Sequence, residues 1–168
     1  MVYNLLYRAG SANDVQQLTN LSVTAYGKYA QILTPDNWLT LKENLNDEKL
    51  MSELVKKSYS FVCVDGEIII GMAFLLPSGN PTDIFREDWC YIRMVGVHPG
   101  YTGRGIARKL TLTCIEKAKG LNEKIIALHT SEFMDAARHL YESMGFKIWK
   151  EIPDRLGKKY WLYVLDIS

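Results

Sequence analysis

One stretch of the chain constrains the fold more than any other. Residues 89–97, WCYIRMVGV, form an apolar run typical of a buried strand, and a loop with Pro99 and three glycines follows it. Beyond the loop, apolar residues recur at helical spacing on one face, namely Ala107, Leu110, Cys114 and Ala118. A strand, a tight glycine loop and a helix in this order indicate a fold that mixes strands and helices.

Turn residues, helix caps and apolar spacing predict the remaining elements. Asp65-Gly66 between two apolar runs predicts a β-hairpin, and Thr34 followed by Pro35 predicts the start of a helix. We expect strands at 2–8, 59–64, 68–76, 124–130, 146–151 and 160–166, and helices within 11–25, 34–45, 47–57 and 134–144. The chain contains no repeat and no evident linker. One mixed α/β domain over residues 1–168 accounts for this order of elements.

Composition excludes several classes of protein. The 20 Lys and Arg residues balance 19 Asp and Glu residues, so no overall field favours nucleic acid or an anionic membrane. Cys63, Cys90 and Cys114 are widely spaced and are expected to be buried apolar residues, not metal ligands. The first residues do not read as a secretory signal, and no apolar run approaches the roughly 20 residues of a membrane span. We therefore expect a cytoplasmic protein without a metal.

The glycine loop is suited to holding a phosphate group. The first N–H groups of a helix have no partner within the helix and lie at the positive end of its dipole. Gly103 and Gly105 allow positive φ angles, while Arg104 and Arg108 can add positive charge. The alternative is that the glycines only make a turn. A Walker loop is excluded by the absence of Gly-Lys-Ser/Thr, and a dinucleotide fingerprint by Arg108 at the place of its third glycine.

Two motifs resemble those of a known family. The pattern V-x-V-x-P-x-Y-x-G-R-G-I-A, residues 95–107, is similar to motif A of the GCN5-related N-acetyltransferases, the GNAT family. The pattern A-x-x-L-Y-E-S-M-G-F, residues 137–146, resembles motif B of the same family. The resemblance implies a mixed, mostly antiparallel sheet with helices on both faces. It also implies two parallel strands that splay apart to hold the acyl-carrying coenzyme.

The resemblance further implies a cofactor and a reaction. Acetyl-CoA would be the co-substrate, and its acetyl group would pass to a primary amine of a small molecule or a peptide by direct attack in a ternary complex. The residues implied for the pantetheine arm are Val95, Gly96 and Val97. Those implied for the pyrophosphate are Thr102, Gly103, Arg104, Gly105, Ile106, Ala107 and Arg108. The family also lines its acceptor site from the region that here contains Tyr26, Tyr29 and Trp38.

Two residues are candidates for catalysis. Tyr141 matches the tyrosine that in many family members protonates the departing thiolate, although periodicity alone also fits a core aromatic residue. His129 occupies the strand position where some members place a glutamate, and an imidazole near pKa 6.5 suits a general base. The alternative for His129 is a hydrogen-bonded core residue. Glu87 and Asp88 remain rival bases.

Two departures from the family pattern keep a second function open. Thr102 stands where the family has Gln or Arg, and Met134 stands where it commonly has Asn. A non-catalytic acyl-CoA-binding or sensing module would tolerate both changes, and a regulator that binds another nucleotide is a third reading. The acceptor and the acyl chain length do not follow from the sequence. Residues 160–165, YWLYVL, are expected to form an exposed sheet edge that pairs two subunits into a homodimer.

Overall fold

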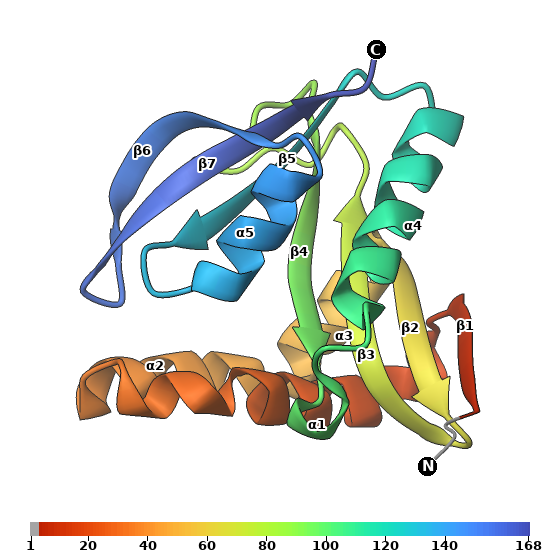
Figure 1. Ribbon diagram of the computed structural model, residues 1–168, viewed down its shortest axis with the longest axis vertical. Helices are drawn as coiled ribbons and strands as arrows, with labels where there is room; N and C mark the ends of the chain where they lie inside the picture. Colours follow the sequence, from red (N-terminus) through yellow and green to blue (C-terminus); the bar gives the residue numbers. More distant parts are fainter. Residues whose placement is uncertain (1–3) are drawn as a thin grey trace.

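The computed structural model describes residues 4–168, and a single seven-stranded sheet runs through them (Figure 1). The strands in spatial order are β1 (Leu5–Ala9), β2 (Tyr59–Asp65), β3 (Ile68–Leu76), β4 (Cys90–Val97), β5 (Ile125–Ser131), β7 (Lys158–Asp166) and β6 (Lys147–Arg155). Neighbouring strands are antiparallel, except for the parallel pair β4 and β5. The predicted mixed, mostly antiparallel sheet is confirmed.

Helices cover both faces of the sheet, as predicted (Figure 1). The α-helices are α1 (Val15–Tyr26), α2 (Pro35–Leu45), α3 (Glu48–Lys57), α4 (Ile106–Gly120) and α5 (Asp135–Ser143). Short 3₁₀ turns η1 (Ala12–Asp14), η2 (Gly27–Gln31) and η3 (Pro99–Tyr101) join them to their neighbours. Side chains of α4 and α5 share one hydrophobic cluster with the sheet, and those of α1 and α3 share another. Within residues 4–168, no helix combines the length and the apolar character that crossing a bilayer requires.

Local capping explains where two of these helices begin. The Thr34 hydroxyl accepts a hydrogen bond of 3.2 Å from the Asn37 N–H, and Pro35 occupies the first helical position of α2. The Asp47 carboxylate accepts hydrogen bonds from the N–H groups of Lys49 and Leu50 at the start of α3. Each cap satisfies backbone N–H groups that have no partner within the helix, and only residues 46 and 47 separate α2 from α3.

The hairpin of β6 and β7 differs from the sequence prediction. Both strands are longer than predicted, because the turn is only Leu156 and Gly157, with φ of 55° and 71°. β6 continues through Pro153, and it can do so because it lies at the edge of the sheet, where proline is tolerated. β7 lies between β5 and β6, and therefore the expectation that residues 160–165 form an exposed edge is wrong. Whether the protein forms a homodimer stays a prediction.

The position of α4 on the sheet depends on Gly71 in β3. A Cβ atom at residue 71 would lie 2.8 Å from Cγ2 of Ile106 and 3.2 Å from a methyl group of Leu110. Both of these α4 side chains are buried, and Ile106 is β-branched and cannot easily turn away. The glycine therefore allows the first turn of α4 to lie directly on the sheet.

We predict that Gly71→Ala lowers the free energy of unfolding by about 1 to 3 kcal/mol, because the added methyl group overpacks the contact with α4. Urea unfolding measures this change. Gly27→Ala is the matched control, since Gly27 has an ordinary φ of −59° and nothing within 4 Å of its added Cβ. It is expected to be neutral or slightly stabilising. Equal losses in the two variants would contradict the proposed close packing.

Candidate active site

The two parallel strands separate after a very short ladder. β4 and β5 pair only at Cys90–Ile126 and Tyr91–Ala127. Beyond this point β4 remains paired with β3 as far as Val97, while β5 remains paired with β7 as far as Ser131. One edge of β4 thus loses its neighbouring strand, and Figure 1 shows the two strands diverging there. An extended ligand with its own amide groups can pair with such an edge.

A β-bulge in β4 accompanies this separation. Arg93 pairs with Phe74 and Gly96 pairs with Met72, so Met94 and Val95 together oppose the single residue Ala73. Met94 has a φ of 56°, which is unusual for a residue other than glycine. A bulge bends its strand and changes the direction of its side chains and amides. The bulge therefore redirects β4 beside the opening.

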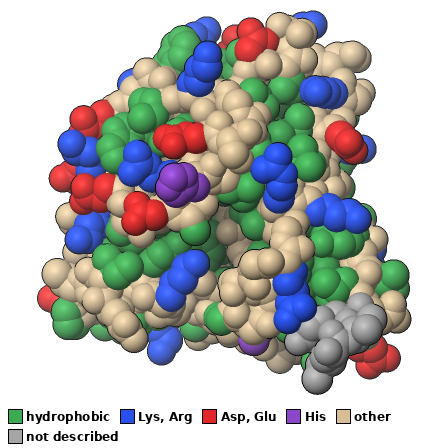
Figure 2. All heavy atoms as spheres, in the orientation of Figure 1, with side chains coloured by type: hydrophobic (Ala, Val, Ile, Leu, Met, Phe, Trp, Pro, Cys, Tyr) green, Lys and Arg blue, Asp and Glu red, His purple; other side chains and the backbone are tan. Residues whose placement is uncertain are grey.

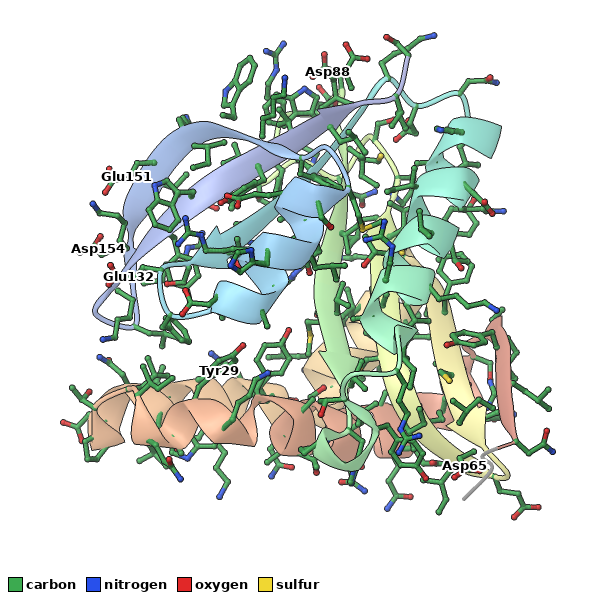
Figure 3. The ribbon with its side chains drawn as sticks, viewed as in Figure 1. Tyr29, Asp65, Asp88, Glu132, Glu151 and Asp154 are labelled. Carbon is green, nitrogen blue, oxygen red and sulfur yellow. The ribbon has the colours of Figure 1, made fainter. Side chains whose placement is uncertain are left out.

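The separated strands open onto a cavity of about 780 Å³ that also reaches the layer of α1, α2 and α3. Tyr141, His129 and Val95, which were predicted for different roles, all line it. Figure 2 shows a recess near the middle of this face, between α5 and the start of α4. Tyr26 and Tyr29 also line the cavity, and Figure 3 shows Tyr29 directed into it from η2. Trp38 is not among the lining residues.

Tyr141 lies on the inner face of α5 with only 7% of its surface exposed. Its ring packs edge-on against Phe146, with ring centres 5.8 Å apart. Burial is the main reason that the pKa of Tyr141 lies above its usual value, and the neighbouring Tyr26 adds to the effect. The phenol consequently keeps its proton at neutral pH and is available as a hydrogen-bond donor to the cavity.

His129 lies on β5, with its ring near Phe85 and stacked on Tyr160 at 5.9 and 5.7 Å between ring centres. Its buried Nδ1 atom has no hydrogen-bond partner within residues 4–168. Burial, followed by the positive charges of Arg155 and Arg93, lowers the pKa of His129 to about 4. This pKa lies well below the ordinary imidazole value near 6.5. The imidazole is therefore neutral at pH 7 and a weaker base than expected.

The rival bases lie elsewhere. Neither Glu87 nor Asp88 lines the cavity. Asp88 forms an exposed ion pair of 3.2 Å with Arg86, and Figure 3 shows it at the opposite end of the molecule from Tyr29. Among the side chains considered as bases from the sequence, His129 is therefore the one that lies in the cavity with Tyr141.

The glycine loop has the backbone geometry predicted for it. Gly103 and Gly105 have φ of 77° and 75°, and Gly105 is the N-cap of α4. The first hydrogen bond of the helix runs from the Lys109 N–H to the Gly105 carbonyl, so the preceding N–H groups have no acceptor in the helix. An added Cβ at either glycine would meet nothing within 4 Å. The loop therefore presents open space beside the first N–H groups of α4, for which the helix provides no acceptor.

The side chains of Thr102, Ile106 and Arg108 contact neighbouring parts of the protein and so hold the loop and the start of α4 in place. The Thr102 hydroxyl donates to the Pro99 carbonyl at 3.2 Å, and the Ile106 side chain is 2% exposed. Arg108 donates to the Ser143 hydroxyl at 3.2 Å, which connects the loop with the end of α5. For Thr102 and Ile106 it is thus the backbone, and not the side chain, that is available to a ligand.

The comparison with protein families agrees with this architecture. The model of the acetyltransferase (GNAT) family matches residues 16–146. The chain therefore belongs to the acetyltransferase (GNAT) family. An uncharacterised N-acetyltransferase of Escherichia coli, YjgM, is 29% identical over 116 residues, which cover 68% of this chain and 66% of that protein. N-alpha-acetyltransferase 30 of Schizosaccharomyces pombe is 31% identical over 94 residues, covering 56% of this chain and 61% of that protein.

Solved structures share the whole fold at lower identity. The PaiA N-acetyltransferase of Thermoplasma acidophilum, in complex with coenzyme A, matches with a TM-score of 0.78 and 14% identity over 97% of this chain and 99% of that one. YncA of Salmonella typhimurium, with acetyl-CoA, matches with a TM-score of 0.70 and 20% identity over 98% and 94%. At identities of 14% and 20%, the similarity to these two structures establishes the fold of this chain and nothing further.

Sequence reasoning missed several residues of the cavity. Arg93, Arg155 and Tyr160 line it from three different strands, and Tyr91 adds a further phenol. Arg155 was unpredictable because the strand that places it extends past Pro153. Arg93 lies in the predicted strand 89–97, but the sequence does not show which side chains of that strand line a cavity. No local signal brings these positions together, since their proximity depends on the sheet order.

We predict that His129 makes the protein less stable in mild acid. The unfolded chain takes up a proton on this imidazole near pH 6.5, whereas the folded protein does so only near pH 4. The free energy of unfolding therefore decreases as the pH falls through this interval, by about 2 to 3 kcal/mol between pH 7 and 4.5. In His129→Gln this contribution should be absent. Urea unfolding at both pH values measures the difference.

The control is His139→Gln, because His139 is exposed on α5. It should lose as much stability in acid as the unchanged protein does. If His129→Gln also lost as much, the low pKa of His129 would be contradicted.

Proposed function

We propose that this protein transfers an acyl group, most simply acetyl, from acyl-CoA to a primary amine. The observation that carries the proposal is the separation of β4 and β5. It places the glycine loop and α4 at one end of an open strand edge, and Tyr141 and His129 in the cavity beside that edge. Names of relatives that include N-acetyltransferase, and neighbours solved with coenzyme A or acetyl-CoA, support the same activity.

The chain has suitable groups for each part of the co-substrate. Backbone amides of Val95, Gly96 and Val97 would pair with the two amides of the pantetheine arm. The backbone of residues 102–108, with Arg104 and Arg108 at its rim, would hold the pyrophosphate at the positive end of α4. The positive φ of both glycines and the free space above them fit a close approach of phosphate. Acetyl-CoA is accordingly the proposed co-substrate.

The proposed reaction is a direct attack in a ternary complex. The amine nitrogen forms a bond to the thioester carbon, the C–S bond breaks, and coenzyme A leaves as its thiol. Backbone N–H groups of residues 94–97 would stabilise the negative charge that develops on the carbonyl oxygen. The Tyr141 hydroxyl would donate to the sulfur as it becomes negative, and its raised pKa keeps that proton in place beforehand.

His129 is proposed to receive the proton that the amine must lose, either directly or through a water molecule. Its unpartnered Nδ1 is an available acceptor, and its low pKa ensures that it is neutral before the reaction. A base of pKa about 4 does not remove a proton from a free ammonium group efficiently. We therefore place its role after attack begins, when the nitrogen has become much more acidic.

We predict that Tyr141→Phe lowers kcat by about 100-fold or more, because the thiolate loses its proton donor. Thiol release from acetyl-CoA, measured with a panel of amines, gives kcat, and calorimetry with coenzyme A gives the affinity, which should not change. Tyr59→Phe serves as the control, since Tyr59 is 39% exposed and does not line the cavity. Full activity of Tyr141→Phe would remove Tyr141 from the mechanism.

The same panel tests the alternative function. A protein that binds acetyl-CoA but acylates no amine would be a binding or sensing module. A protein without affinity for any acyl-CoA would contradict both proposals.

We predict that Gly105→Ala weakens binding of coenzyme A by about tenfold, because a left-handed conformation costs about 1 to 2 kcal/mol for alanine. The loop then loses the arrangement of N–H groups that would hold the pyrophosphate. Gly79→Ala is the matched control, because Gly79 has a φ of 95° and equal space but lies in the loop before β4. It should lose stability without losing affinity in calorimetry. A comparable loss of affinity in both variants would contradict the proposed phosphate site.

A further inference from the structure

One end of the cavity carries positive charge that no residue fully neutralises. Arg93 of β4 and Arg155 of β6 both line it, next to His129 of β5. Arg93 forms no ion pair with the residues that the structure describes. Arg155 is 3.6 Å from Asp83, but the Asp83 side chain is 80% exposed, so water screens this pair. The two guanidinium groups thus leave a net positive charge beside His129.

The other charged groups of the cavity lie on α3. Glu53 and Lys57 are four residues apart and therefore face the same way on the helix, where their charges offset each other. The Asp47 carboxylate is already used as the cap of α3. None of these three groups compensates the two arginines.

This charge distribution restricts the amine that the cavity can accept. A simple alkylamine or a polyamine is cationic at neutral pH and would be repelled by Arg93 and Arg155. An amine that carries its own carboxylate brings the missing negative charge. Guanidinium groups bind carboxylates well, since their N–H groups match the two carboxylate oxygens.

The spacing along β4 also favours a carboxylate close to the amine. Arg93 precedes Val95 by two residues, with only the bulge residue Met94 between them, and Val95 is the proposed contact of the pantetheine arm. A nucleophilic nitrogen near the thioester would then have its carboxylate within reach of the guanidinium group. Leu41, Leu45 and Leu54 form an apolar part of the cavity wall on α2 and α3, next to polar residues such as Asn44.

We propose that Arg93 and Arg155 form a carboxylate-binding site, and that the acceptor is a free α-amino acid with an apolar side chain. The proposal rests on the proposed acyltransferase function and specifies its substrate class. Two observations support it independently of that function: two arginines line one cavity with a single, largely exposed counter-charge, and the buried Nδ1 of His129 in the same cavity has no partner among residues 4–168. Besides burial, Arg155 and Arg93 lower the pKa of His129, while Asp83 raises it by less, which agrees with a net positive charge at this position.

The test compares three acceptors that differ in their carboxylate. L-Leucine carries it beside the amine, the dipeptide Leu-Gly carries it one residue further away, and L-leucinamide lacks it. We expect kcat/KM for leucine to exceed that for leucinamide by tenfold or more, with Leu-Gly below leucine. Equal values for leucine and leucinamide would overturn the proposal, and a preference for Leu-Gly would overturn the assignment of a free amino acid.

Two variants assign the effect to the arginines. Arg155→Met and Arg93→Met replace the guanidinium group by an unbranched neutral side chain, and each should lower kcat/KM for leucine at least tenfold more than kcat/KM for leucinamide, mainly through KM. Lys150→Met is the matched control, because Lys150 is an exposed cation on the same strand as Arg155 and does not line the cavity. Equal losses for leucine and leucinamide would show a structural defect and overturn the proposal.

Failure of this proposal can be told apart from failure of the proposed function. If leucinamide and isoamylamine are acetylated as fast as leucine, the proposed acyltransferase activity is supported and the proposed carboxylate-binding site is overturned. If no amine is acetylated, the proposed acyltransferase activity is overturned. Calorimetry in the presence of coenzyme A then still tests the carboxylate-binding site, because it measures the affinity for each amine. Leucine must then bind to the unchanged protein at least tenfold more tightly than leucinamide, and Arg155→Met must abolish the difference. Equal binding would overturn the site.

Discussion

The divergence of β4 and β5 is the constraint on which the rest of the structure depends. Each strand keeps an antiparallel partner on its outer side, so the separation costs backbone hydrogen bonds only along the facing edges. The bulge at Met94 and Val95 bends β4 at the same place. The open edge, the glycine loop at the start of α4 and the Tyr141 hydroxyl are thereby brought around one opening.

Burial in this opening has opposite effects on its two candidate catalytic groups. It raises the pKa of the Tyr141 phenol and lowers that of the His129 imidazole, so both side chains are neutral at pH 7. A neutral acid and a neutral base can thus lie in the same cavity. The charge of this region comes instead from Arg93 and Arg155, which have a guanidinium group that stays protonated.

Local sequence signals predicted most of the fold. The Asp65-Gly66 turn, the Thr34-Pro35 cap and the apolar spacing of α4 act between near neighbours, and the structure has the elements they predict. The two family motifs added the diverging strands. The extent of β6 escaped prediction because Pro153 is acceptable only at a sheet edge, and edge position depends on the order of all strands.

The candidate site was predictable only in part. Tyr141 and His129 were selected from motif and strand position, and both line the cavity. The pKa of His129 was not predictable, since it depends first on burial and then on Arg155, which is 26 residues distant in the chain and near only through the pairing of β5, β7 and β6. The bulge was not predictable either, because its residue of positive φ, Met94, is not a glycine.

The short ladder between β4 and β5 also divides the sheet into two halves. α4 packs on β2, β3 and β4, and the Tyr101 hydroxyl donates to Asp65, which attaches the glycine loop to the first half. α5 packs on β5 in the second half. The contacts between the halves include the two residue pairs of the ladder, the Arg108–Ser143 hydrogen bond, the Arg155–Asp83 ion pair and shared hydrophobic clusters. A molecule lodged between the halves touches both at once, so its binding free energy opposes their separation and adds to the cohesion of the whole sheet.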